Sequence, residues 1–431
     1  MSRPVLIVNA RLLDPASGLD QRGGVLIVNE RIAELGAGVT PTRAPGGAEI
    51  VDARGLCLAP GIVDMRVQLG EPGAEHKERF ESGGAAAVAG GVTTMAVLPN
   101  TEPPIDDPAM VEFVARRARQ AKLAKVYPYA AVTRRLEGKE LAELGLLKAA
   151  GAVAFTDGER AVARASLMRR ALSYARMLDG LIVQHPEDPS LAEGGVMNEG
   201  AIATRLGLAG IPVAAEVMMI ERDLRLVELT GGRIHFAHVS TGAAIEAIRA
   251  AKARGLAVTC DTSPHHLALN ELEVEGYRTF AKVSPPLRRE EDRLAVVEGL
   301  KDGTIDAIAS DHCPQDQDSK RLPFAQAAFG VIGVQTLLAV SLTLVHEGRI
   351  GLLELLRLLT ASPAAILGLE AGRLERGAAA DLFLLDLEAP WKITEQNLRS
   401  LAKNTAFEGR LVQGKVVRTL VDGRTVFQAE R

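Results

Sequence analysis

Residues 233–260, RIHFAHVSTGAAIEAIRAAKARGLAVTC, contain a strand, a helix and a second strand in immediate succession. RIHFA is a short apolar run, Ser240 can open the helix that follows it, and that helix ends near Gly255 before the apolar run LAVTC. Two short strands joined by a helix predict a parallel pair with a crossover connection.

The same unit recurs along residues 59–370. Further helices are expected from Asp107-Pro108 onward and over 138–150, 166–178, 213–229 and 289–302, each beside a short apolar run. Such repetition predicts the α/β class, either as a (β/α)8 TIM-type barrel or as a doubly wound sheet. No Gly-x-Gly-x-x-Gly sequence follows the first strand, which favours the barrel over a dinucleotide-binding sheet.

Both ends of the chain have a different pattern. Residues 1–58 and 371–431 contain apolar stretches rich in Val, Ile and Leu that are broken by Asn, Asp, Gly and Pro. Asp422-Gly423 is a hairpin-turn sequence. These two segments are predicted to form one small β-sandwich domain beside the barrel of residues 59–370.

Composition narrows the class of protein. The 431 residues are 47% hydrophobic and 24% charged, which is typical of a globular chain. The formal net charge of -4 leaves no basic surplus, so neither nucleic acid nor a membrane surface is expected as a main partner. No signal peptide is recognised in MSRPVLIVNARLLDP, and Cys57, Cys260 and Cys313 fit no disulfide framework. We therefore expect a cytoplasmic protein.

Ionisable side chains follow several of the expected strands. Asp157, His185, His238 and Asp311 each come directly after an apolar run. In a parallel barrel the carboxyl ends of the strands form the face that carries active sites. Imidazole and carboxylate are zinc ligands, so Asp157, His185 and His238 are candidates for one metal site. Asp311 could orient or deprotonate a metal-bound water.

Several stretches resemble the successive motifs of dihydroorotase, in the amidohydrolase superfamily. They include PGIVDMRVQLGEPGAEHKE, AFTDGE, IVQHPED, IHFAHVSTGAAIEAI, VTCDTSPHHL and ASDHCPQ, and the resemblance covers nearly the whole chain. It implies a metal-bearing (β/α)8 barrel with a terminal β-domain. The implied activity is the reversible cyclisation of carbamoyl aspartate to dihydroorotate, in pyrimidine synthesis. Carried over residue by residue, it makes Asp157, His185 and His238 metal ligands, Asp311 the catalytic acid/base and Asn100 a substrate-binding residue.

Five positions depart from the motifs of that family. Arg66 and Gln68 stand where the family has the two histidines of His-x-His, and Gly70 stands where it has a carboxylate-binding arginine. Ser284 replaces an asparagine, and Gln315 replaces a substrate-contacting histidine. Arginine has no lone pair to offer a metal. The resemblance therefore predicts zinc at no more than one ion per chain, or none.

These departures lead to a first hypothesis, a non-catalytic homologue that serves as a structural or regulatory partner of aspartate transcarbamoylase. In that case Arg66 is expected to pair with Asp311 or Asp157, because an unpaired buried carboxylate would cost several kcal/mol.

Two other hypotheses remain open. The chain could be a working cyclic-amide hydrolase with a single metal ion, acting on dihydroorotate or on hydantoin-like or dihydropyrimidine rings. It could also be a binding module for a small cyclic amide or carboxylate. A homodimer is the default expectation for its oligomeric state.

Overall fold

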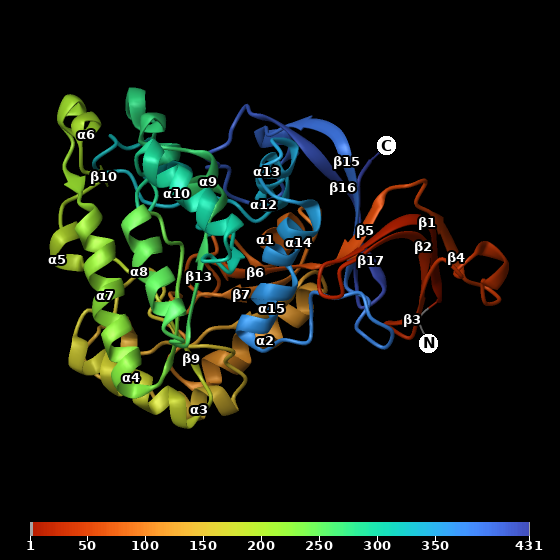
Figure 1. Cartoon of the computed structure of the whole chain (residues 1–431), viewed down its shortest axis with the longest axis horizontal. Helices are drawn as coiled ribbons and strands as arrows, with labels where there is room; N and C mark the ends of the chain where they lie inside the picture. The colour runs from red at the N-terminus through yellow and green to blue at the C-terminus, as the bar shows by residue number, and fades with distance from the viewer. Residues whose placement is uncertain (1–2, 431) are drawn as a thin grey trace.

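The computed structural model of the chain describes residues 3–430. Its larger part (left in Figure 1) is a closed ring of parallel strands surrounded by helices. Backbone pairing joins neighbouring strands, isolated pairs through Phe155 link the first three strands to the next, and the Val67–His312 pair closes the ring. The eight members are β6 (Ile62–Val67), β7 (Val92–Val97), β8 (Lys125–Pro128), the segment at Phe155, β9 (Leu181–Gln184), β12 (Arg233–Phe236), β13 (Val258–Thr262) and β14 (Ala307–Ile308).

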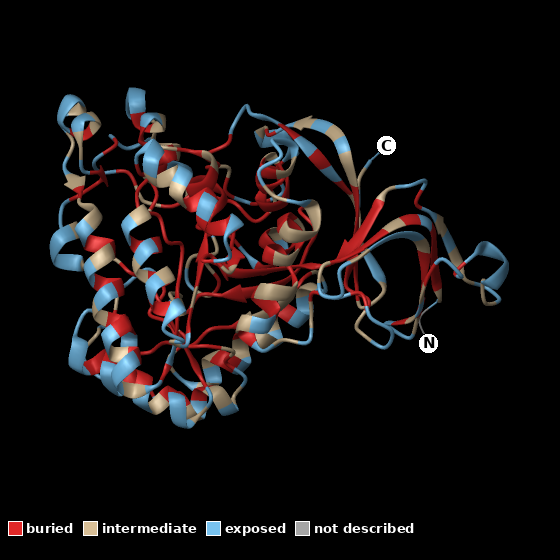
Figure 2. Ribbon diagram, viewed as in Figure 1, coloured by how far each residue is buried: buried red, intermediate tan, exposed pale blue. Residues whose placement is uncertain are grey.

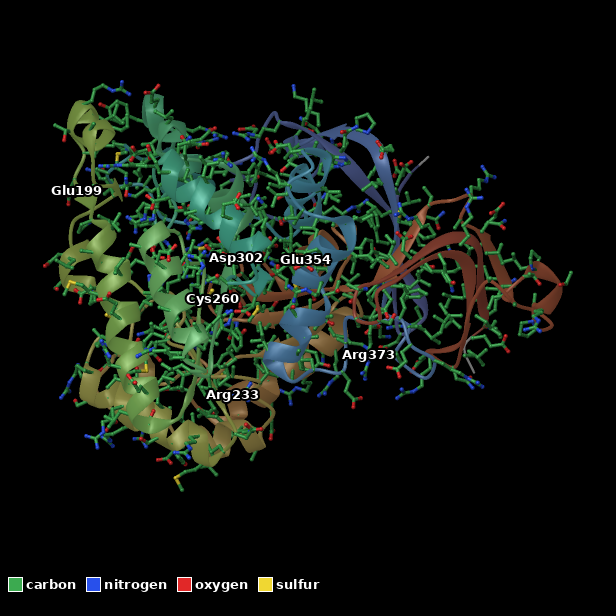
Figure 3. All side chains as sticks on the ribbon, viewed as in Figure 1. Glu199, Arg233, Cys260, Asp302, Glu354 and Arg373 are labelled. Carbon is green, nitrogen blue, oxygen red and sulfur yellow. The ribbon has the colours of Figure 1, made fainter. Side chains whose placement is uncertain are left out.

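The ring strands are apolar because helices cover their outer surface. Every residue of β6, β7 and β9 is buried, as expected for parallel strands enclosed on both faces. Figure 2 shows this buried centre surrounded by helices whose outer faces are exposed. Arg233, which begins β12, lies near the lower edge of the barrel in Figure 3, with Cys260 of β13 above it.

The covering helices begin and end close to the expected residues. Asp107 caps α2 (Pro108–Ala121) by accepting a hydrogen bond from the Met110 backbone at 3.1 Å. Thr241, rather than the expected Ser240, caps α8 (Gly242–Ala253). The covering helices are α1 (Phe80–Ala89), α2 (Pro108–Ala121), α4 (Ala165–Met177), α7 (Val213–Thr230), α8 (Gly242–Ala253), α10 (Glu290–Lys301), α14 (Leu352–Leu359) and α15 (Ala361–Leu367).

The helix expected over 138–150 is shorter than predicted. It is α3 (Leu144–Ala149). The residues before it turn back and pair with residues 132–134. Thr133 and Leu141 form an antiparallel pair, and the Ala142 backbone donates to the Val132 carbonyl at 2.9 Å. These hydrogen bonds use the backbone groups that a longer helix would have needed.

The two ends of the chain form one hydrogen-bonded sheet at the side of the barrel (right in Figure 1). β5 joins them, because it pairs parallel with β1 and antiparallel with β15. The strands are β1 (Val5–Asp14), β2 (Leu19–Val28), β3 (Arg31–Gly36), β4 (Glu49–Asp52), β5 (Cys57–Pro60), β15 (Leu382–Lys392), β16 (Leu411–Val421) and β17 (Arg424–Gln428).

The predicted class is confirmed: a TIM-type barrel with a small β-domain built from both termini. The expected hairpin at Asp422-Gly423 joins β16 to β17. The exact domain limits, at 58 and 371, remain a prediction.

Short elements fill the connections between the longer strands and helices. Among residues 3–430, no helix has the length and apolarity that crossing a bilayer requires. The short elements are α5 (Pro189–Ala192), β10 (Met197–Asn198), α6 (Ala201–Leu206), β11 (Gly210–Ile211), α9 (Pro264–Ala268), α11 (Gln317–Arg321), α12 (Leu337–Ser341) and α13 (Thr343–His346), with 3-10 turns at Pro41–Arg43, Arg134–Leu136, Glu271–Tyr277, Thr279–Ala281 and Glu395–Asn397.

Candidate active site

The carboxyl ends of the barrel strands bring four of the singled-out side chains together. Arg66 lies near the end of β6, His185 follows β9, His238 follows β12 and Asp311 lies beyond β14. His238 and Asp311 have left-handed backbones, with φ of 40° and 50°. Non-glycine residues rarely adopt this conformation, and such strain gathers at functional sites.

Arg66 and Asp311 form a buried ion pair at the centre of this group. Nε of Arg66 donates to Oδ1 of Asp311 at 2.7 Å, and the two side chains are 3% and 11% exposed. Nη2 of Arg66 donates to the Gly158 carbonyl at 3.3 Å. The expected pairing of Arg66 is therefore confirmed, with Asp311 rather than Asp157 as its partner.

The carboxylate of Asp311 is held in its ionised form. Burial favours the neutral acid, but the charged Arg66 guanidinium paired with Asp311 holds the pKa of Asp311 well below its usual range. Oδ2 faces two imidazole nitrogens, Nδ1 of His238 at 3.7 Å and Nε2 of His265 at 3.5 Å. The Asp311 carboxylate is therefore deprotonated near pH 7.

His185 and His238 face one another directly. Nδ1 of His185 lies 3.0 Å from Nε2 of His238, and the rings are stacked. Nε2 of His185 lies 3.7 Å from the Glu187 carboxylate. Burial, together with the charge of Arg66, lowers the pKa of His238 well below its usual value, so this ring is neutral near pH 7.

Asp157 does not join the two histidines. Its Oδ1 accepts from the backbone nitrogens of Val132 and Thr133 at 3.0 and 2.9 Å, and its Oδ2 accepts from the Thr133 hydroxyl at 2.5 Å. Burial raises the pKa of Asp157 to about 6. Both carboxylate oxygens of Asp157 therefore accept hydrogen bonds from the loop that follows β8.

The predicted zinc ligands are consequently not assembled as a set of three. Across residues 3–430, no group of three or more His, Cys, Asp or Glu side chains is arranged to hold a metal ion. Catalytic zinc ordinarily has three protein ligands. His185 and His238 alone do not fit such a site.

Gln68 and Asn100 belong to a line of hydrogen-bonded side chains beside the ion pair. Asn100 Nδ2 donates to Gln68 Oε1 at 3.1 Å, and Gln68 Nε2 donates to Glu159 Oε1 at 2.7 Å. The same Glu159 oxygen accepts from the Cys313 thiol at 3.1 Å, and Gln315 Nε2 lies 3.5 Å from Cys313 Sγ. Two of the five departures, Gln68 and Gln315, are thus part of one polar line.

The remaining two departures have local roles. Gly70 has φ of +61°, and a Cβ there would lie 2.6 Å from the Ala74 carbonyl oxygen, so a larger residue is strained in this turn. Ser284 donates its hydroxyl hydrogen to Glu187 Oε1 at 3.3 Å. Ser284 therefore contacts the Glu187 carboxylate, whose Oε1 lies 3.7 Å from His185 Nε2.

Several buried polar atoms at the site have no hydrogen-bond partner within residues 3–430: Arg66 Nη1, Asn100 Oδ1, Glu187 Oε2, His238 Nδ1 and His265 Nε2. Unsatisfied buried polar atoms are costly, and a ligand or water commonly satisfies them. Arg66 Nη1 is the charged donor among them. The arrangement thus offers an ionised acceptor of protons, Asp311, beside an unused guanidinium donor.

Sequence reasoning assigned no role to three members of the site. His265 lies in VTCDTSPHHL, whereas Glu159 and Glu187 each come two residues after a strand-end residue that was singled out. Inspecting the second residue after each candidate would have found both glutamates.

Comparison with known protein families gives two overlapping matches. The family model described as Dihydro-orotase-like matches residues 55–244, and the model described as Amidohydrolase family matches residues 220–427. Together these ranges contain every site residue named above.

Individual relatives match along almost the whole chain. A protein named dihydroorotase from Pelobacter propionicus is 48% identical over 98% of this chain and 99% of its own length. Another of that name from Anaeromyxobacter dehalogenans (strain 2CP-1) is 48% identical over 100% of this chain and 99% of its own length. The solved L-hydantoinase (dihydropyrimidinase) from Arthrobacter aurescens superposes with a TM-score of 0.88 at 27% identity, covering 99% of this chain and 96% of that one.

Proposed function

Because the chain belongs to the dihydroorotase family of amidohydrolases, we propose that it opens and closes the cyclic amide ring of dihydroorotate in pyrimidine biosynthesis. The names of its relatives support the substrate. The observation that carries the chemistry is the Asp311 carboxylate, which is ionised at the barrel mouth with one oxygen on Arg66 and the other facing two imidazoles.

Asp311 is the proton carrier of the proposed reaction. In the opening direction, a water molecule attacks the amide carbonyl carbon while Asp311 takes one of the water protons. The carbon–nitrogen bond then breaks, and the ring nitrogen takes that proton from Asp311. Closure runs through the same steps in reverse, so one carboxylate serves as base and then as acid.

Arg66 supplies the positive charge of the proposed reaction. Its Nη1 hydrogens have no acceptor among the described residues, and they lie on a guanidinium fixed by Asp311 and Gly158. A fixed donor can stabilise the negative charge that develops on the carbonyl oxygen during attack. The same guanidinium keeps Asp311 ionised for the first step.

Turnover by the purified full-length chain tests the proposal, with zinc content per chain measured on the same preparation. We expect ring opening of dihydroorotate to exceed that of hydantoin and dihydrouracil, and no more than one zinc ion per chain. Faster opening of hydantoin would contradict the substrate, and the absence of turnover on all three rings would contradict the activity.

A second candidate function is favoured by the Arg66–Asp311 pair itself. An arginine in this place neutralises a buried carboxylate permanently, which suits a barrel kept for its shape as a non-catalytic partner of aspartate transcarbamoylase. Size-exclusion chromatography of the chain alone and mixed with the aspartate transcarbamoylase of the same organism tests it. A shared peak without turnover would support this function, and separate peaks would contradict it. The elution volume of the chain alone tests the expectation that it forms a homodimer.

A further inference from the structure

We propose that Lys77 binds the carboxylate of the substrate, in place of the arginine that this chain lacks at Gly70. The inference rests on the proposed function, because it concerns a ring that carries a carboxylate. It assigns substrate selection to a residue in the loop between β6 and α1, whereas the reaction itself is assigned to Asp311 and Arg66.

Lys77 is a half-buried ammonium group with hydrogen-bonding capacity to spare. Its Nζ donates to Gln315 Oε1 at 2.9 Å, and it forms no ion pair with a carboxylate among residues 3–430. The neighbouring Asp316 carboxylate is engaged in capping α11, where it accepts from the Ser319 backbone at 2.9 Å. An ammonium group has three donors, so Lys77 can bind a carboxylate without giving up Gln315.

Gln315 connects Lys77 to the candidate site. Its side-chain nitrogen donates to the Phe329 carbonyl at 2.9 Å and lies 3.5 Å from the Cys313 thiol, which donates to Glu159. Glu159 in turn accepts from Gln68, the partner of Asn100. Lys77 is therefore the cationic end of the polar line that runs past the ion pair.

The turn at Gly70 explains why the cation comes from position 77. The Ala74 backbone donates to the Gly70 carbonyl at 2.5 Å, and a side chain at 70 would meet the Ala74 and Glu78 carbonyl oxygens. An arginine would be strained in this tight, left-handed turn. The same turn reverses the chain. Lys77, seven residues after Gly70, therefore contacts Gln315.

Calorimetric titration of the full chain with orotate and with uracil tests the inference without needing turnover. The two rings differ in the carboxylate alone. We expect K77M to weaken orotate binding by about ten- to a hundredfold, the loss typical of a charge-assisted contact, and to leave uracil binding unchanged. K77R should restore most of the orotate affinity. H76Q, a change at the exposed neighbour in the same loop, should leave both affinities unchanged.

The outcomes separate this inference from the proposed function. Equal orotate affinity in the wild type and K77M would overturn the role of Lys77 and leave the function standing. Equal losses for orotate and uracil in K77M would also overturn it, because they would indicate a disturbed loop. Failure of the wild type to bind orotate at all would overturn the inference together with its substrate class.

Discussion

Arg66 is a buried charged residue at the mouth of the barrel. A permanently charged guanidinium lies against Asp311, and both side chains are almost fully buried. Removing one member of such a pair leaves the other charge buried and unpaired, which is more costly than never having had the pair. Breaking the pair by changing one partner should therefore destabilise the protein, and the pair is also the electrostatic centre of the site.

The R66M substitution tests that expectation. We expect it to lower the free energy of unfolding by about 3 kcal/mol, because Asp311 then loses its charged partner. Urea denaturation measures the change. In a double-mutant cycle with D311N, the two substitutions should couple by about 2 kcal/mol. Additive effects of the two single substitutions would show that the pair contributes nothing.

The sequence allowed a pairing of Arg66 with Asp311 or Asp157 to be predicted, because all three residues lie at strand ends and Arg66 has the opposite charge; the structure shows that the partner is Asp311. It did not allow the fate of Asp157 to be predicted. That depends on Thr133 and Val132, which lie in a loop whose return path is visible only in the backbone. The polar line through Gln68, Glu159 and Gln315 likewise joins three loops that are far apart in the sequence.

At the scale of elements, helix ends could be read from the sequence wherever a capping residue marks them. Asp107 bounds α2 as expected, and α7 (Val213–Thr230) ends one residue beyond the expected range of 213–229. The segment before Leu144 could not be predicted, since its backbone hydrogen bonds go to residues 132–134 rather than into a helix.

Asp107 provides a test of the capping interaction on α2. Its side chain accepts from the Met110 backbone at 3.1 Å. D107A should lower the free energy of unfolding by about 1 kcal/mol, whereas D107N, which keeps an acceptor, should change it little. Thermal and urea denaturation of both variants check this. Equal losses in the two variants would point to charge rather than to the cap.

The loop that includes α11 contains a buried lysine with unusual protonation. Burial lowers the pKa of Lys320 to about 7, and its Nζ donates to the Ala328 carbonyl at 2.8 Å. In the unfolded chain a lysine holds its proton up to about pH 10.4, so the unfolded state binds more protons between these values. The contribution of Lys320 to the free energy of unfolding therefore rises as pH increases above about 7.

K320M removes this titration. We expect the stability of K320M relative to the wild type to be greater at pH 6, where the wild type buries an ammonium ion, than at pH 9. Urea midpoints at the two pH values measure the difference. A difference that is the same at pH 6 and pH 9 would show that Lys320 keeps its proton in the folded protein throughout this range.

At the scale of the whole molecule, the sheet and the barrel share a core. Phe383 of β15 is fully buried in the same apolar cluster as the barrel strands, and a Cβ on Gly91 would lie 3.2 Å from its ring. Leu384, the next residue, packs instead among the strands of the sheet. One face of β15 therefore packs against the barrel, and the other face packs within the β-domain.

F383A should consequently destabilise both parts together, by about 3–5 kcal/mol. Trp391, the single tryptophan, reports on β15 by fluorescence, and circular dichroism reports on the barrel helices. The two unfolding midpoints should fall by the same amount in F383A. L384A serves as the matched control inside the sheet. A shift confined to the fluorescence would show that the two parts unfold independently.

The most direct test of the whole account is the rate of dihydroorotate ring opening by the wild type and by D311N, with folding of both checked by circular dichroism. Since Asp311 is the proposed carrier of the proton, the wild type should turn the substrate over and D311N should be slower by about a hundredfold or more. Equal rates in the two proteins, or no turnover by a folded wild type, would contradict the account.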